Sequence, residues 1–168
     1  NSAVFFRCIA TSALLRRAAP ALGLGFALSL SSSFGQTYFI SLFAGDIRAD
    51  LNLTHGSVGV FYTCSTLVSA VVFLWLGNLA DRFDLSLLSA IGLVGLSGCA
   101  MLMAGADSVI ALILALFGLR LFGQGLMSHI AITAMGRWFS AERGRALSIA
   151  SLGFPFGEAV LPVLAAFF

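Results

Sequence analysis

The sequence predicts an all-α, polytopic helical membrane protein with about five transmembrane helices. Hydrophobic residues make up 60% of the 168-residue chain, charged residues only 10%, and the mean hydropathy is +1.03. A soluble domain ordinarily has about 45 to 50% apolar and about 25% charged residues. The apolar residues also gather into long runs with short polar connections, a pattern typical of helices that cross a bilayer.

Five apolar runs are long enough to cross about 30 Å of hydrocarbon, which requires about 20 residues of helix. They cover residues 20–44, 57–80, 85–106, 109–136 and 146–168. We expect them to form one transmembrane bundle over residues 19–168, preceded by an N-terminal segment over residues 1–18. The connections are short, so each helix should pack antiparallel to the one before it.

Arginines indicate how the chain is oriented. The chain has no lysine, and seven of its nine arginines flank the N-terminal segment and the second and fourth connections, against Arg48 on the other side. Because positive charge concentrates in cytoplasmic loops, residues 1–18 should be cytoplasmic in an integral membrane protein, here placed in a bacterial inner (plasma) membrane. An alternative treats Arg16 and Arg17 as the start of a cleaved signal peptide. The apolar run continues to Ala44, which favours a transmembrane span.

Cysteines and histidines indicate no metal, no cofactor and no enzyme. Cys8, Cys64 and Cys99 lack the spacing of metal ligands, and His55 and His129 are isolated from other ligand types. His129 is expected near the cytoplasmic end of the fourth run. No nucleophile and base stand together in a common loop. The small net charge of +2 argues against a nucleic-acid partner.

The connection between the second and third runs reads Gly77-Asn78-Leu79-Ala80-Asp81-Arg82-Phe83-Asp84. It resembles the loop signature of the major facilitator superfamily of transporters. That resemblance implies twelve helices in two six-helix halves, latched together at this loop. By the resemblance, Gly77 permits close helix approach, Asp81 is the latch carboxylate and Arg82 is its charged neighbour. Asp84 replaces the family's second glycine, and the family's following basic pair is missing.

The fourth run contains Arg120-Leu121-Phe122-Gly123-Gln124-Gly125, which is similar to the family's fourth-helix pattern. An arginine near the bilayer centre costs at least about 2.5 to 3.5 kcal/mol and normally faces a watery cavity or a partner. Arg120, Gln124 and Ser128 are spaced by four residues, so they form one polar stripe that should face inward. The stripe favours an anion-binding site, with a structural ion pair between helices as the alternative.

Two further polar faces come from hydroxyl and amide side chains on the first two runs. Gln36 shares helical spacing with three serines, whereas Thr37 and Tyr38 lie off that face. The faces comprise Ser29, Ser32, Ser33 and Gln36 in the first run, and Tyr62, Thr66 and Ser69 in the second. They are predicted either to join helices by hydrogen bonds or to line a cavity, with Gln36 as a polar contact of a solute.

The fifth run should bend, because Pro155 removes a backbone donor between Gly153 and Gly157. Glu158 is the residue after Gly157. Counted from the cytoplasmic ends of their helices, Arg120 and Glu158 lie at the same depth to about one turn. The sequence therefore predicts Glu158 as an ion-pair partner of Arg120 or as a proton site.

Arg137-Trp138-Phe139, with Arg143-Gly144-Arg145 after it, resembles a motif of organic-acid and monocarboxylate facilitators. The resemblance implies secondary active transport of a small solute, with organic anions favoured and a coupled proton left open, by alternating access. The alternative function is a membrane-embedded scaffold or receptor-like protein. The chain lacks an initial Met and stops within an apolar run, so we expect a fragment whose partners are the lipid bilayer and the missing C-terminal half.

Overall fold

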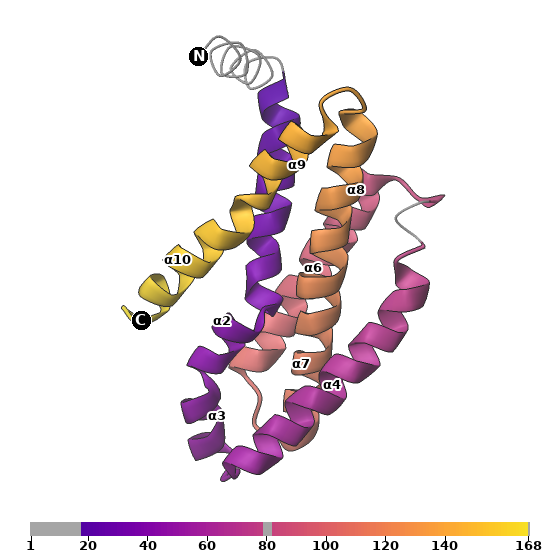
Figure 1. The fold of residues 1–168 in the computed structure, drawn as a ribbon. Helices are drawn as coiled ribbons and strands as arrows, with labels where there is room; N and C mark the ends of the chain where they lie inside the picture. Colours follow the sequence, from indigo (N-terminus) through magenta and orange to yellow (C-terminus); the bar gives the residue numbers. More distant parts are fainter. Residues whose placement is uncertain (1–17, 79–81, 168) are drawn as a thin grey trace.

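A computed structural model describes residues 18–78 and 82–167; within these ranges the chain forms helices joined by short turns and loops, without a strand (Figure 1). Five helices are long and apolar enough to cross a membrane, which confirms the predicted all-α, polytopic fold. These candidate spans are Ala18–Gly35, His55–Leu76, Leu85–Ala104, Val109–Trp138 and Arg143–Ala165. The predicted N-terminal segment lies almost entirely outside the described residues.

The elements follow the chain in a simple order. After the first helix come the 3₁₀ turn η1 (Ser32–Gly35) and the short helices α2 (Thr37–Leu42) and α3 (Ala44–Asp50). The next two spans are the single helices α4 (His55–Leu76) and α6 (Leu85–Ala104). The fourth span comprises α7 (Val109–Gly118), η2 (Leu119–Met127) and α8 (Ser128–Trp138), and the fifth comprises α9 (Arg143–Ser151) and α10 (Gly153–Ala165).

The first predicted span differs from the structure, because the helix is not continuous over residues 20–44. It tightens into η1 and breaks at Gln36, whose backbone is extended (φ −84°, ψ 153°). The Ser32 hydroxyl donates to the carbonyl of Ser29 at 2.7 Å. Such side-chain bonds compete with the regular helical ladder and favour tight or bent turns. The break changes which side chains face the bundle beyond Gln36.

The fourth span forms the centre of the bundle. In an apolar stretch of 18 residues within this span, 44% is buried, whereas only 11% of a stretch of the same length in α4 is buried. Its middle section, η2, is a π-helix of nine residues that contacts η1, α4 and α6. A π-helix hydrogen-bonds from residue i to i+5 and is rare outside functional sites. The polar stripe predicted from the sequence begins in this unusual section.

The fifth span is interrupted at Leu152, between α9 and α10, and α10 diverges from the bundle (Figure 1). Pro155 explains the position of the break, because it cannot donate to the carbonyl of Ser151 four residues earlier. The two neighbouring glycines have another role. A Cβ on Gly153 would meet the backbone of the first helix at Phe26, and one on Gly157 would meet Ser33. They let α10 pack against the first helix, as small residues do between membrane helices.

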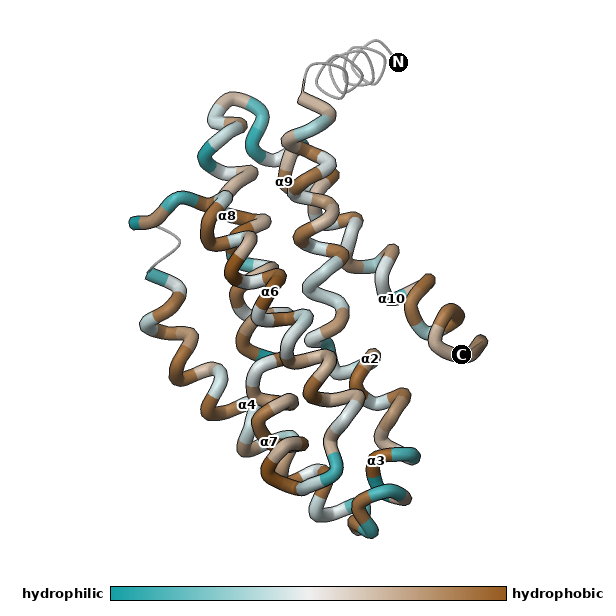
Figure 2. Tube along the Cα trace, turned by 180° about the vertical axis from the view of Figure 1, so that it is seen from behind, coloured by the Kyte–Doolittle hydropathy of each residue, from teal (hydrophilic) through white to brown (hydrophobic). Residues whose placement is uncertain are grey.

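Polar segments gather at the two ends of the bundle, while apolar residues follow the lengths of the helices (Figure 2). The connection between α4 and α6 and the one between α8 and α9 lie at the end of the bundle where the first helix begins, and α3 lies at the opposite end (Figure 1). In the sequence, Arg82, Arg137, Arg143 and Arg145 belong to or flank these two connections, and Arg48 belongs to α3. Arg145 pairs with Glu142 at 3.1 Å. The structure thus places the described arginines of the second and fourth connections at the same end.

Candidate functional site

Arg120 is buried in the middle of the bundle, with 9% of its surface exposed. Its Nη1 donates to the carbonyl of Gly35 at 3.2 Å and to the hydroxyl of Thr37 at 3.5 Å. Its guanidinium carbon lies 5.3 Å from the centre of the Tyr62 ring, a cation–π arrangement. Thr37 and Tyr62 share a hydrogen bond of 2.6 Å. The arginine therefore joins the first, second and fourth spans.

The Gly35 carbonyl is available because the first helix ends there, at the break before Gln36. The last carbonyls of a helix lack partners within the helix and carry a partial negative charge, which stabilises a nearby cation. Arg120 therefore occupies a favourable place without a carboxylate. Thr37 was expected to lie off the polar face of the first run. It contacts Arg120 because the extended residue before it turns α2 away from the path of a continuous helix.

The contact between the first and fourth spans depends on two glycines that leave no room for a side chain. A Cβ on Gly35 would approach the Leu119 carbonyl and would lie 2.8 Å from the Gln124 nitrogen, and one on Gly123 would lie 2.7 Å from the Cα of Gly35. Both distances are below 3.0 Å and involve backbone atoms, which move little. The close contact of these backbones brings the Gly35 carbonyl within reach of Arg120.

A cavity of about 440 Å³ opens between α4 and the fourth span. Its wall on the fourth span contains the predicted stripe, Arg120, Gln124 and Ser128, followed by His129. The opposite wall comes from α4 and contains Thr66, Ser69 and Phe73; the remaining lining residues are Ala70, Gly125 and Ile132. The stripe thus lines a cavity together with two of the hydroxyls predicted on the second run.

Buried polar atoms without a hydrogen-bond partner concentrate in this cavity. Within the described residues six side chains have such atoms, and four of these line the cavity: Thr66 Oγ1, Arg120 Nε, Gln124 Oε1 and His129 Nε2. Native proteins leave few buried polar groups unpaired, so a cluster of them needs a partner such as water or a ligand. Donors and acceptors are both present. The cavity is suited to a small polar solute that carries negative charge.

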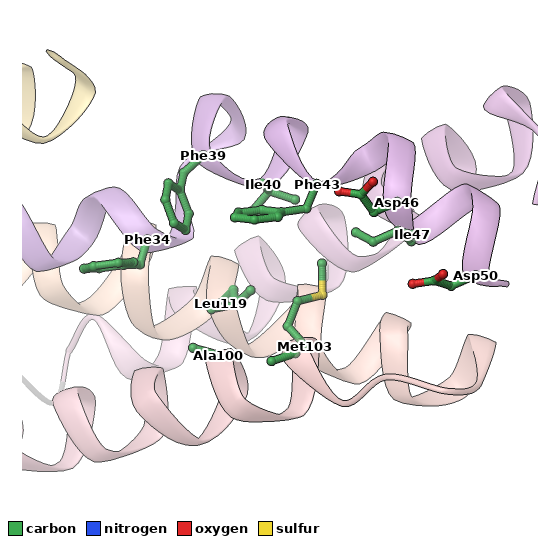
Figure 3. Close-up of a pocket in the computed structure, with 11 residues that line it drawn as sticks. Phe34, Phe39, Ile40, Phe43, Asp46, Ile47, Asp50, Ala100, Met103 and Leu119 are labelled. Atoms are coloured by element: carbon green, nitrogen blue, oxygen red, sulfur yellow. The ribbon is translucent and has the colours of Figure 1, made fainter. Parts of the chain in front are cut away.

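A second cavity, of about 300 Å³, lies between α2, α3 and α6 and has a different character (Figure 3). Phe34, Phe39 and Phe43 lie along it, and the carboxylates of Asp46 and Asp50 lie at its α3 end (Figure 3). Its wall contains none of the unpartnered buried atoms found in the described residues. Its apolar lining makes it the weaker candidate for a polar solute.

Two residues predicted to contact the solute or Arg120 lie outside the polar cavity. Gln36 is half-buried at the break and does not line this cavity. Glu158 is exposed on α10, and no ion pair within 4.0 Å joins it to Arg120 in the described part of the chain. Equal depth along two helices does not fix which way a side chain points. The functional role of Glu158 stays a prediction.

The predicted latch lies partly outside the described residues, because Asp81 falls in the gap at 79–81. Gly77 ends α4, and its N–H donates to the carbonyl of Phe73 at 2.7 Å. The atoms nearest to a Cβ on Gly77 also belong to Phe73, in the same helix. This contact is local rather than between helices. Arg82 is exposed at the same end of the bundle.

Sequence reasoning missed two residues of this region. Thr37 was placed on the wrong face for the reason given above, and His129 was treated as an isolated side chain. His129 lies nine residues after Arg120, and this spacing does not match the four-residue interval of the stripe. The wide turns of η2 shift the register of the residues that follow it, so His129 reaches the same cavity.

The fold and the site define a polytopic helical membrane protein with a buried arginine in a polar cavity between its helices. The chain belongs to the Major Facilitator Superfamily, which it matches over residues 25–168. Membership makes it a membrane transporter in general terms, from a family whose members are transporters rather than enzymes. Comparisons with curated proteins and with solved structures found no match.

Proposed function

We propose that the protein transports a small organic anion and that the anion binds in the cavity between α4 and the fourth span. The observation that carries this proposal is the cluster of four buried, unpartnered polar atoms around one buried arginine. The Nη1 of Arg120 is used by Gly35 and Thr37, whereas its Nε has no partner among the described residues. One side of the guanidinium is thus fixed by the protein, and donors remain for a solute.

The energetics favour an anion over a neutral solute. A charge at the bilayer centre costs at least about 2.5 to 3.5 kcal/mol, and the helix end at Gly35 typically returns about 0.3 to 1 kcal/mol, rising to about 2 kcal/mol in a buried site. An anion on Arg120 would remove most of the remaining cost. A carboxylate also matches the planar geometry of a guanidinium. Gln124 Oε1 would accept a hydrogen bond from a hydroxyl or ammonium group on the same solute.

The transport mechanism is proposed from the family. A cavity open between the helices of one bundle needs an opposing wall, which the second six-helix half of a family member would supply. Alternating access then follows from movement of one half against the other around a site near the midplane. Arginines at one end of the bundle support a cytoplasmic N-terminus by the positive-inside rule.

Uptake into proteoliposomes tests this function directly. The full protein that carries this chain is reconstituted, and uptake of formate, lactate and succinate is measured with and without an imposed pH gradient. We expect saturable uptake of at least one carboxylate, loss of that uptake in Arg120→Gln, and only partial recovery in Arg120→Lys, which keeps the charge but not the planar fork.

Tyr62→Phe is the matched control, because it removes the hydrogen bond to Thr37 and keeps the ring beneath Arg120. It should fold like Arg120→Gln but retain uptake. Thermal unfolding of each purified variant separates loss of folding from loss of binding. Uptake of a neutral solute that survives Arg120→Gln, or absence of all carboxylate uptake, would contradict the proposal.

A further inference from the structure

His129 lies in the same cavity as Arg120 but has a different environment. Its Nε2 is buried without a hydrogen-bond partner among the described residues, and its ring meets the Phe73 ring nearly edge-on, with centroids 5.6 Å apart. A histidine with only a packing role normally has its buried ring nitrogens satisfied. His129 also lines the polar cavity, so this ring can take part in binding a solute or a proton there.

The charged groups around His129 divide into one that shares its cavity and several that lie outside it. The cavity wall contains one other charged side chain, Arg120, and no carboxylate among the described residues. The described elements around α8 also carry titratable or charged groups outside the cavity: His55, Tyr62 and Cys64 on α4, Asp84 and Cys99 at α6, and Glu142, Arg143 and Arg145 at α9. Among the described residues no carboxylate lies on the cavity wall, so a positive charge on His129 would be available to an anion in the cavity.

We propose that His129 is the pH-sensing group of the proposed anion site and couples anion binding to a proton. This inference rests on the proposed function. A protonated imidazole adds a second positive charge to a cavity that otherwise has only that of Arg120. A carboxylate held at Arg120 then binds more tightly. A proton that enters His129 with the anion from one aqueous side, and leaves with it on the other, makes the site one for proton-coupled anion symport.

The size of the effect follows from the spacing of the two residues. Nine residues of helix separate Arg120 from His129, an axial rise of about 13.5 Å at 1.5 Å per residue. Across about 12 Å, one added charge strengthens anion binding about twofold at the dielectric constant of water and about tenfold at an effective value near 20.

The test measures the KM of carboxylate exchange at equal pH on both sides of the liposome, from about pH 5.5 to 8. The probe is radiolabelled lactate, or formate if the wild type takes it up faster, because both stay ionised over this range. For the wild type we expect KM to rise about two- to tenfold with pH. His129→Gln should give a flat profile at the high value, and His129→Lys a flat profile at the low value. These opposite outcomes are not expected from a packing defect.

His55→Gln is the matched control, because His55 is the other histidine and lies exposed at the start of α4. It should keep the wild-type profile. His129→Asn provides a smaller replacement if the glutamine variant unfolds. A pH-dependent KM that persists in both His129→Gln and His129→Asn would overturn this inference while leaving the anion site intact. Carboxylate uptake that does not depend on Arg120 would instead overturn the proposed function.

Discussion

Gly123→Ala should separate the first and fourth spans and so disturb Arg120 without touching it. The added Cβ would lie 2.7 Å from the Cα of Gly35, 2.8 Å from its nitrogen and 3.1 Å from the Cδ1 of Leu96. Non-bonded carbons prefer about 3.5 to 4.0 Å, so the two backbones must move apart by about 1 Å. Arg120 Nη1 already lies 3.2 Å from the Gly35 carbonyl. A shift of this size would break that hydrogen bond.

The expected cost is about 1 to 3 kcal/mol for overpacking, plus about 0.5 to 1.5 kcal/mol for the lost hydrogen bond. Reversible unfolding in a detergent titration measures the change in free energy, and carboxylate exchange measures the change in KM. Gly98→Ala on α6 is the control, because a Cβ there meets nothing within 4 Å. Because alanine has a higher helix propensity than glycine, Gly98→Ala should leave the free energy of unfolding unchanged or raise it slightly. If Gly123→Ala matches Gly98→Ala within about 0.5 kcal/mol and keeps its KM, the close backbone contact does not position Arg120.

Three further predictions concern orientation, Glu158 and the break in the fifth span. In a cysteine-free full protein, an impermeant thiol reagent added outside intact cells should label Thr54→Cys and spare Ser86→Cys; the reverse pattern would refute a cytoplasmic N-terminus. A double-mutant cycle on Arg120 and Glu158 should give a coupling energy below about 0.5 kcal/mol, because no ion pair joins them; about 1 kcal/mol or more would show that they meet in another state. Pro155→Ala restores a backbone donor and should straighten the fifth span, seen as a changed spin-label distance between α2 and α10; an unchanged distance would mean that another contact holds the bend.

Apolar run length and charge placement predicted the helical fold, because a helix in lipid must satisfy its own backbone and need only be long and apolar enough. Run length and charge placement do not show where a helix breaks within a span. Serine and glycine are common in membrane helices, so the turn that ends the first helix at Gly35 looked like part of a longer span. The polar stripe from Arg120 was predicted, since four-residue spacing keeps side chains on one face.

The expected contact between Arg120 and Glu158 illustrates what residue counting leaves out. Counting gives depth, but the π-turns of η2 and the break at Leu152 each alter the direction in which later side chains point. The π-turns of η2 lie where Gly35 and Gly123 bring the first helix against the fourth span, whereas the break follows from Pro155. The same change of register brings His129 into the cavity, which no spacing rule indicated.

The exposed position of Glu158 also distinguishes between the outer faces of the bundle. Leu67, Val71 and Leu74 are exposed on α4 and are compatible with acyl chains. An ionised carboxylate is not compatible with acyl chains, because its transfer from water into hydrocarbon would cost several kcal/mol of hydration free energy. The face of α10 that carries Glu158 must therefore border water or polar protein surface. Accessible area alone does not define a lipid-facing surface in this protein, and annular lipid should avoid that stripe of α10.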